Sequence, residues 1–341
     1  MPTVIDVARK ALVTPGTVSN VITGKRPVSV GTRARVLAAM EELDYRPNLL
    51  ARGLVQQRTQ TIALLIPNIT NPFYPEVAEE VERMVKAQGY HLFLVCHTLD
   101  AAVERDHLDA LIGRMVDGLL IVPGTANLAD VKDRLPVVLL LSEESQSAES
   151  LPTVAIDFRH AGELAARHLL DLGHRRVAAV PELPFHASRL EGFRTTLAAA
   201  GVTLADECVR VGASTVESGY RAAADLLALP QRPTAVFATN DLMALGVMEA
   251  AADVGLRVPR DLSIVGLDDI MLGAHVRPSL TTIAVPKRQL AAEATDLLLR
   301  HIEEGLRSPP PVVVRPHLVV RRSTAPVRVD ATDATDKPLT A

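Results

Sequence analysis

The chain has 341 residues, of which 48% are hydrophobic and 22% charged, a balance typical of a globular protein with room for several domains. Aromatic residues make up only 3% and tryptophan is absent, so aliphatic side chains must fill the cores. No run reaches the ~20 apolar residues of a membrane helix, no secretory signal opens the chain, and two cysteines cannot form a disulfide framework, so we expect a cytoplasmic protein.

The net charge of −4 hides an uneven distribution. Residues 1–60 carry nine Lys and Arg against four Asp and Glu, a balance of +5. The other 281 residues hold 27 of the 36 basic and 36 of the 40 acidic residues, a balance of −9. A small basic module on a larger acidic body predicts that the module meets a polyanion.

Short helical patterns follow one another within residues 1–46. Thr3 is expected to cap the first helix, Thr14 the second, with Pro15 at its first helical position, and Ser29 the third. Two such helices joined by a short turn make a helix-turn-helix, whose second helix enters the major groove of DNA. On periodicity alone, a generic three-helix cap remains open.

Residues 3–8, 17–21 and 33–48 resemble the headpiece of the lac/galactose-repressor family, and the resemblance continues to about residue 325. It implies that DNA is contacted by the recognition helix and its cap, namely Thr14, Pro15, Gly16, Thr17, Ser19 and Asn20.

Two features of this headpiece depart from the family pattern. Pro15 and Gly16 offer almost no hydrogen-bonding side chain, so they can specify DNA only by contact and shape, whereas Asn20 can pair with an adenine edge. Leu12 stands where the family usually has a turn glycine, and a left-handed turn would strain a leucine. A two-lobe small-molecule-binding protein with a degenerate headpiece is therefore the alternative.

Residues 47–58 resemble the family's hinge helix, which folds only on DNA. Alone, this segment can form one or two helical turns, and such a short helix is marginal. The resemblance implies that Leu54 is the wedge that unstacks a base step in the minor groove. A plain linker is the alternative.

From residue 61 onward, short apolar runs alternate with helical patterns, as in doubly wound parallel sheets. The pattern resembles an α/β two-lobe protein of the periplasmic-binding-protein type. We expect an effector and dimerisation domain over 59–325, with a disordered tail over 326–341. Lobe one is expected over about 61–157 plus 287–321, and lobe two over about 158–286. The predicted buried strands are 62–66, 92–95, 119–122, 137–141, 177–180, 235–238 and 263–266, with a crossing at 154–157.

Ligands of doubly wound sheets lie beyond the carboxyl ends of the strands, here between the lobes. The resemblance implies that the effector contacts are Phe73, Arg189, Asn240 and Asp268, a set suited to a sugar, a sugar derivative or a nucleoside. Taken singly, such residues are more often caps or surface groups; Asp241, for instance, could cap the following helix. Ser142-Glu143-Glu144 replaces the Arg, Asn or Asp usual in the family.

Motifs of enzymes are missing: there is no P-loop, dinucleotide turn, HExxH or serine elbow. Cys96-His97 and Asp106-His107 lack completing metal ligands. We therefore expect no catalytic residue, metal, cofactor or membrane contact.

The sequence predicts a transcriptional regulator, most simply a repressor, that binds a palindromic double-stranded operator as a homodimer under control of a small-molecule effector. Whether effector releases or promotes DNA binding stays open, and an exported solute-binding protein and a two-lobe enzyme are the rivals.

A fragment of residues 59–341 should not bind operator DNA, because the basic excess precedes it. The full chain should bind, with an affinity that falls steeply with added salt, because binding releases counterions from the DNA. Mobility shifts on DNA flanking the protein's own gene measure both. Operator binding by the fragment would overturn the division into a DNA-binding module and an acidic body.

Overall fold

The computed structural model describes residues 2–24, 26–46, 58–97, 100–124, 128–142, 151–182, 187–305 and 309–328. The chain divides into two compact units, Met1–Gln60 and Thr61–Ala341, which are described separately. Among the described residues, no helix combines the length and the apolar character needed to cross a membrane. The predicted hinge over 47–58, with Leu54, lies outside these residues except for Arg58.

The first unit contains helices α1 (Val4–Ala11), α2 (Pro15–Thr23) and α3 (Val30–Glu42). The predicted N-caps are confirmed: the hydroxyls of Thr3, Thr14 and Ser29 each accept a hydrogen bond from a backbone N–H in the first turn of their helix. The helices pack on a small aliphatic core of Val7, Ala8, Ala11, Val18, Val21, Val36 and Ala39. This core fixes the geometry of a helix-turn-helix.

Leu12 ends α1 in the left-handed conformation, with φ of 53° and ψ of 49°. The turn therefore keeps the geometry that favours glycine although a leucine occupies it. The Leu12 side chain is 86% exposed, so packing does not repay the strain. The departure from the family pattern costs stability and leaves the path of the turn unchanged.

In the second unit, the first lobe is built on a parallel sheet in the order β10-β5-β4-β3-β1-β2. Side chains alternate across it: Ile62, Leu64 and Ile66 of β1 face α5 and α13, whereas Ala63 and Leu65 face α6 and α7. The strands are β1 (Thr61–Ile66), β2 (His91–Cys96), β3 (Gly118–Ile121), β4 (Val137–Ser142), β5 (Thr153–Ile156) and β10 (Val312–Val314), and the helices are α5 (Phe73–Ala87), α6 (Ala101–Gly113), α7 (Ala129–Lys132) and α13 (Lys287–Glu304).

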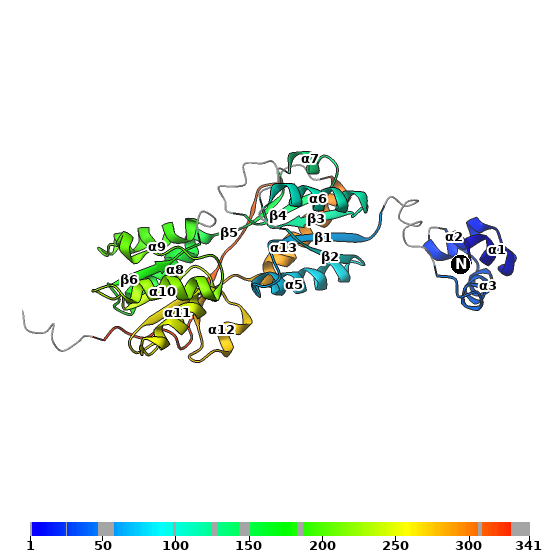
Figure 1. Cartoon of the computed structure of the whole chain (residues 1–341). Helices are drawn as coiled ribbons and strands as arrows, with labels where there is room; N and C mark the ends of the chain where they lie inside the picture. The colour runs from blue at the N-terminus through cyan, green and yellow to red at the C-terminus, as the bar shows by residue number, and fades with distance from the viewer. Residues whose placement is uncertain are drawn as a thin grey trace, which may run out of the picture. The chain divides into compact units, whose positions relative to one another are not determined.

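The second lobe has a sheet in the order β11-β9-β8-β7-β6, parallel except for β11. Helices α8 and α9 cover one face and α10 and α11 the other (Figure 1). The strands are β6 (Val177–Val180), β7 (Ala235–Ala238), β8 (Ser263–Asp268), β9 (Thr281–Ala284) and β11 (His317–Val319), and the helices are α8 (Phe158–Asp171), α9 (Ala187–Ala199), α10 (Val216–Leu227), α11 (Asp241–Asp253) and α12 (Met271–His275), with a 3-10 turn at Asp206–Cys208.

The structure corrects several expectations. β2 is an edge strand with Phe93 and Leu94 each 43% exposed, because an apolar run alone does not distinguish an edge strand from a central one. Residues 153–156 form a paired strand, not merely a crossing, and β9 was not predicted. The last segment divides between the lobes, since β10 joins the first sheet and β11 the second. The predicted tail begins too early, because the Val327 N–H donates to the Leu172 carbonyl (2.9 Å).

Replacing Leu12 by glycine should stabilise the headpiece by about 0.5–1 kcal/mol, because relief of a left-handed Cβ exceeds the entropy cost of glycine. Urea unfolding of residues 1–60, followed by circular dichroism, measures the change. Leu12→Ala is the matched control: it keeps the Cβ and should gain nothing. An equal gain from both would show that the exposed side chain, not the backbone, is the cost.

Candidate functional site

A hollow of about 370 Å³ lies within the second unit, at the carboxyl ends of the strands of both lobes. Phe73, Arg189, Asn240 and Asp268 all line it, so the structure brings together the four residues expected to contact an effector. Sequence reasoning missed further lining residues, among them Asn71, Tyr74, Phe158, Glu182 and Ser214. The lining combines aromatic rings with a few convergent polar groups, which is typical of a small-molecule site.

Arg189 crosses the hollow from the first turn of α9. Its Nη1 donates to the Thr239 carbonyl (2.7 Å), and its guanidinium lies 4.0 Å from the centre of the Phe158 ring. Within the described part of the chain, its buried Nε has no hydrogen-bond partner. α9 approaches α8 this closely because Gly162 has no side chain: a Cβ there would lie 2.0 Å from the Arg189 carbonyl. Arg189 therefore offers a fixed, desolvated donor.

Asn240 begins a chain of polar contacts along one wall. Its Oδ1 caps α11 by accepting from the Met243 N–H (2.9 Å), and its Nδ2 donates to the Ser214 hydroxyl (2.7 Å). That hydroxyl in turn donates to the Glu182 carboxylate. Capping fixes the Asn240 side chain, so the wall presents a hydroxyl and a carboxylate that sequence reasoning did not find.

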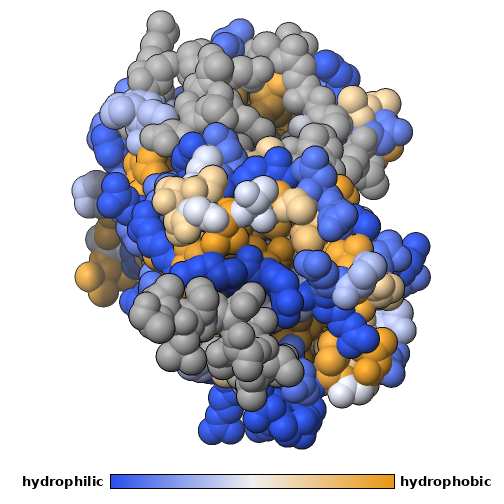
Figure 2. All heavy atoms as spheres, turned by 90° about the vertical axis from the view of Figure 1, so that its left-hand side faces the viewer, coloured by the Kyte–Doolittle hydropathy of each residue, from blue (hydrophilic) through white to orange (hydrophobic). Residues whose placement is uncertain are grey.

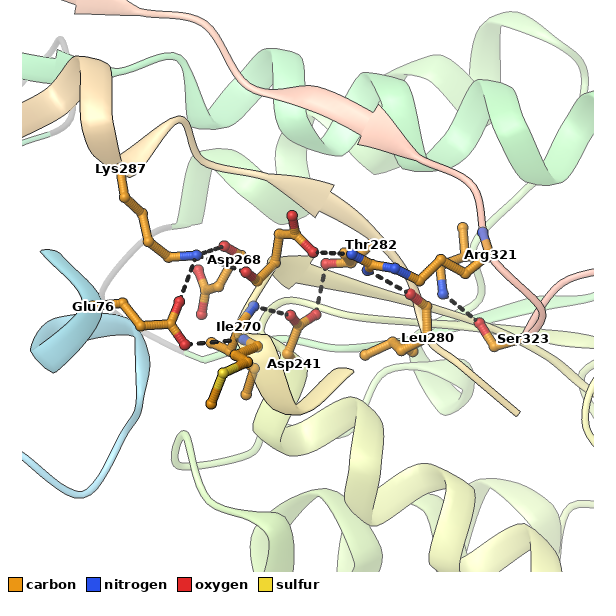
Figure 3. Close-up of polar contacts among 12 residues, drawn as sticks. Glu76, Asp241, Asp268, Ile270, Leu280, Thr282, Lys287, Arg321 and Ser323 are labelled. Atoms are coloured by element: carbon orange, nitrogen blue, oxygen red, sulfur yellow. Dashed lines mark hydrogen bonds and ion pairs between the residues drawn. The ribbon is translucent and has the colours of Figure 1, made fainter. Parts of the chain in front are cut away.

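The turn after β8 is strained. Asp268 and Asp269 have φ of 117° and 54°, in the region that favours glycine. Lys287 Nζ donates to both of their carbonyls, at 2.9 and 2.6 Å, and Arg321 Nη2 lies 2.6 Å from the Asp269 carboxylate (Figure 3). These cations hold the turn so that the Asp268 side chain lines the hollow.

The pKa of the Asp268 carboxyl is raised to about 7. Burial is the main cause, since desolvation penalises the charged form; Glu182 and Glu76 add to the rise, whereas Arg189 and Lys287 oppose it. A carboxyl group with a pKa of about 7 accepts hydrogen bonds when it is ionised and can also donate one when it is protonated.

Asp241 does not cap α11, contrary to the possibility raised from the sequence, because Asn240 does. Its fully buried carboxyl accepts from the Ile270 N–H (2.9 Å) and the Thr282 hydroxyl (2.6 Å), as Figure 3 shows. Burial, followed by the charge of Asp268, holds its pKa well above the usual range. Gly266 leaves room for it, since a Cβ there would lie 2.1 Å from Asp241 Oδ1. Asp241 thus holds the turn after β8 through its hydrogen bond with the Ile270 N–H.

Contacts between the lobes meet beside the hollow. Glu76, on α5 of lobe one, accepts from the Met271 N–H of α12 in lobe two (2.9 Å) and lies 3.0 Å from Lys287 Nζ (Figure 3). We call Glu76, Lys287 and Met271 the interlobe latch. Lys287 also lies 5.6 Å from the centre of the Phe73 ring, so latch and hollow share a residue.

The expected DNA-contacting residues lie on or beside α2. Thr14, Pro15, Gly16 and Ser19 are exposed and Thr17 and Asn20 half-buried, while Val18 and Val21 of the same helix face the core. The Thr14 and Thr17 hydroxyls lie 3.0 Å apart. The helix therefore presents the polar side chains of Thr14, Thr17, Ser19 and Asn20, with Pro15 and Gly16 among them, away from its buried stripe.

No cluster of three or more potential metal ligands occurs among the described residues. Cys96 and Cys208 are free and half-buried. Cys96-His97 and Asp106-His107 therefore complete no metal site within the part of the chain that the structure describes.

Comparison with known proteins finds two matching domain families. The family described as "Bacterial regulatory proteins, lacI family" matches residues 3–48, and "Periplasmic binding protein-like domain" matches residues 166–324. The HTH-type transcriptional repressor PurR of Pectobacterium carotovorum subsp. carotovorum (strain PC1) is 37% identical over 332 residues, covering 95% of this chain and 97% of the relative.

Two solved structures are also similar over 95% of this chain. The lac repressor dimer bound to operator and the anti-inducer ONPF has a TM-score of 0.85 and 26% identity, covering 95% of this chain and 99% of that one. The transcriptional regulator CelR–cellobiose complex has a TM-score of 0.70 and 31% identity, covering 95% and 100%.

Asp268→Asn should stabilise the ligand-free protein more at about pH 8 than at about pH 5. The folded state raises the pKa of this carboxyl from 3.8 to about 7, so the folded state binds its proton more tightly and stability falls as pH rises through that window. Ionising the buried Asp268 carboxyl costs folding free energy on the order of 1 kcal/mol per pKa unit, and the Asn variant removes this cost. Thermal unfolding at both pH values measures it, with Asp225→Asn, an exposed carboxylate, as control. A gain independent of pH would contradict the assignment.

Proposed function

This chain belongs to the lacI family of bacterial regulatory proteins, and on that premise we propose that it is a transcriptional repressor whose hold on a palindromic operator is switched by a small molecule in the hollow between its lobes. The observation that carries the proposal is the convergence of Phe73, Arg189, Asn240 and Asp268 on one hollow in a chain that also carries a helix-turn-helix.

DNA is bound by the headpiece. The exposed face of α2 enters the major groove, where Asn20 can pair with an adenine edge while Thr14, Thr17 and Ser19 lie nearer the phosphates. Pro15 and Gly16 contribute close contact. We further propose that residues 47–58 form a hinge helix on DNA, with Leu54 as the minor-groove wedge. We propose that the protein binds DNA in the cytoplasm, where bacterial DNA lies, and that it catalyses no reaction.

The repressor is a homodimer, because a palindromic site of two half-sites needs two headpieces related by a twofold axis. The exposed edge strand β2 offers a surface for the partner: Phe93 and Leu94 are each 43% exposed, and no strand pairs with its outer edge among the described residues. Covering such an edge with a second copy removes both an apolar cost and a risk of aggregation.

The effector is a sugar-like or nucleoside-like molecule. Such ligands have an apolar ring face and several hydroxyls. The hollow matches both features, with Phe73, Tyr74 and Phe158 as apolar walls and with Arg189 and Asp268 for charge-assisted hydrogen bonds. The solved CelR relative binds cellobiose, which agrees with this class.

The switch works by linkage between the hollow and the lobe angle. An effector that favours one angle shifts the population of that angle by its differential affinity. The interlobe latch responds to the same angle, because Glu76 joins α5 of lobe one to α12 of lobe two. A change of angle then alters the dimer surface and the spacing of the headpieces.

Arg189→Ala should weaken effector binding by about tenfold to a hundredfold, the value of a lost charge-assisted hydrogen bond in a dry site, and leave operator binding without effector near wild type. A thermal-shift screen over sugars, sugar phosphates and nucleosides identifies the effector, since ligand at ~100 times its Kd adds about 2.7 kcal/mol. Calorimetry and operator mobility shifts then measure the variant.

The matched control is Arg194→Ala, which removes an exposed arginine from the same helix, where it lies 3.4 Å from Asp206. It should bind effector and operator like wild type. If Arg189→Ala responds to effector as wild type does, the hollow is not the effector site.

A further inference from the structure

We propose that the edge of the lobe-two sheet opposite the effector hollow is a second ligand site, which binds a small molecule carrying two phosphate groups. The inference is independent of the proposed function, since it uses none of the residues of the effector hollow. A hollow of about 750 Å³ lies at this edge and is bordered by Arg176, Arg232, Arg260 and Arg328.

Topology gathers these arginines. Arg176 directly precedes β6, Arg232 lies three residues before β7, and Arg260 lies three residues before β8. Because the three strands are parallel neighbours, their amino ends meet at one edge of the sheet. The carboxyl ends, which carry Glu182, Asn240 and Asp268, lie at the other edge, so the two sites are separate.

The floor of this hollow is rigid. His174 is 2% exposed, and its ring contacts the Thr234 hydroxyl (2.9 Å), the Ser263 hydroxyl (3.0 Å) and the Ala325 carbonyl (3.1 Å). Burial lowers the pKa of His174, so its role is to fasten the carboxyl-terminal segment to the sheet as a neutral ring. Arg328 follows this anchored segment.

The positive charge of the hollow is poorly compensated. The guanidiniums of Arg176, Arg232 and Arg328 form no ion pair with described residues. Arg260 lies 3.9 Å from Asp261, the one acid among the described residues that line the hollow. Asp261 is engaged more closely by Arg257, whose backbone N–H and Nε donate to it at 3.0 and 3.1 Å.

This concentration of charge stands on a body with 36 acidic and 27 basic residues. Figure 2 shows the molecule from the side on which lobe two lies in Figure 1, where hydrophilic residues form a band beside apolar ones. A concave surface with one sign of charge focuses its field and attracts the opposite ion. Like charges gathered without partners cost energy that a bound anion removes.

Arginine favours phosphate because its planar guanidinium donates two parallel hydrogen bonds to phosphate oxygens. Four arginines around one hollow can engage more than one phosphate group. The chemistry therefore selects a phosphorylated small molecule with two phosphate groups over a monoanion.

The test is calorimetric titration of the full-length protein with inorganic pyrophosphate and, in parallel, with inorganic phosphate. Pyrophosphate should bind at least tenfold more tightly than phosphate. The double variant Arg232→Gln/Arg260→Gln should lose at least tenfold in pyrophosphate affinity, because each arginine contributes charge-assisted hydrogen bonds. Arg189→Ala should keep the affinity, since Arg189 belongs to the other edge.

The matched control is Arg194→Gln/Arg221→Gln, which removes the same charge from exposed sites on the same lobe, where each arginine pairs with its own acid. It should stay within twofold of wild type, and any binding by the basic headpiece is common to all variants. Equal loss in the two double variants, absence of pyrophosphate binding at millimolar concentration, or equal affinity for phosphate and pyrophosphate would each overturn the proposal.

Discussion

The position of Lys287 is the constraint on which the effector hollow depends. The residue lies where the chain leaves β9 of lobe two and enters α13 of lobe one. Its ammonium group holds the two carbonyls of the strained Asp268–Asp269 turn of lobe two and lies 3.0 Å from Glu76 of lobe one. Leaving this largely buried ammonium without partners would cost folding free energy. The Asp268–Asp269 turn, the interlobe latch and the angle between the lobes are therefore held together by one residue.

The strain in this region is organised for binding more than for stability. Backbone at positive φ and carboxyls raised in pKa by burial both cost folding free energy, and both occur around Asp268. Asp241 is accommodated only because Gly266 lacks a side chain. Such costs are tolerated where a rigid, desolvated set of polar groups must be ready for a ligand.

Much of this arrangement could be predicted from the sequence, and the remainder shows why prediction stops. Phe73, Arg189, Asn240 and Asp268 were predicted from the resemblance to the lac/galactose-repressor family, because each lies in a short motif that matches the family's. Glu182 and Ser214 carry no such pattern; only the fold places them beside Asn240. Likewise the hydrogen bond from the Met271 N–H to Glu76 depends on how the two lobes close, which local sequence does not encode. β2 was mistaken for a buried strand because its apolar side chains fit either a core or an interface.

The two edges of the lobe-two sheet illustrate how one topology produces different chemistry. At the carboxyl ends, helix starts and crossing connections bury Asn240, Asp241 and Asp268, so their charges and dipoles act in a dry environment and are tuned by one another. At the amino ends, the arginines that precede the strands are exposed to solvent, and together they concentrate positive charge. Parallel strands align every connection of one kind at one edge, and this alignment allows residues far apart in the sequence to form either kind of surface.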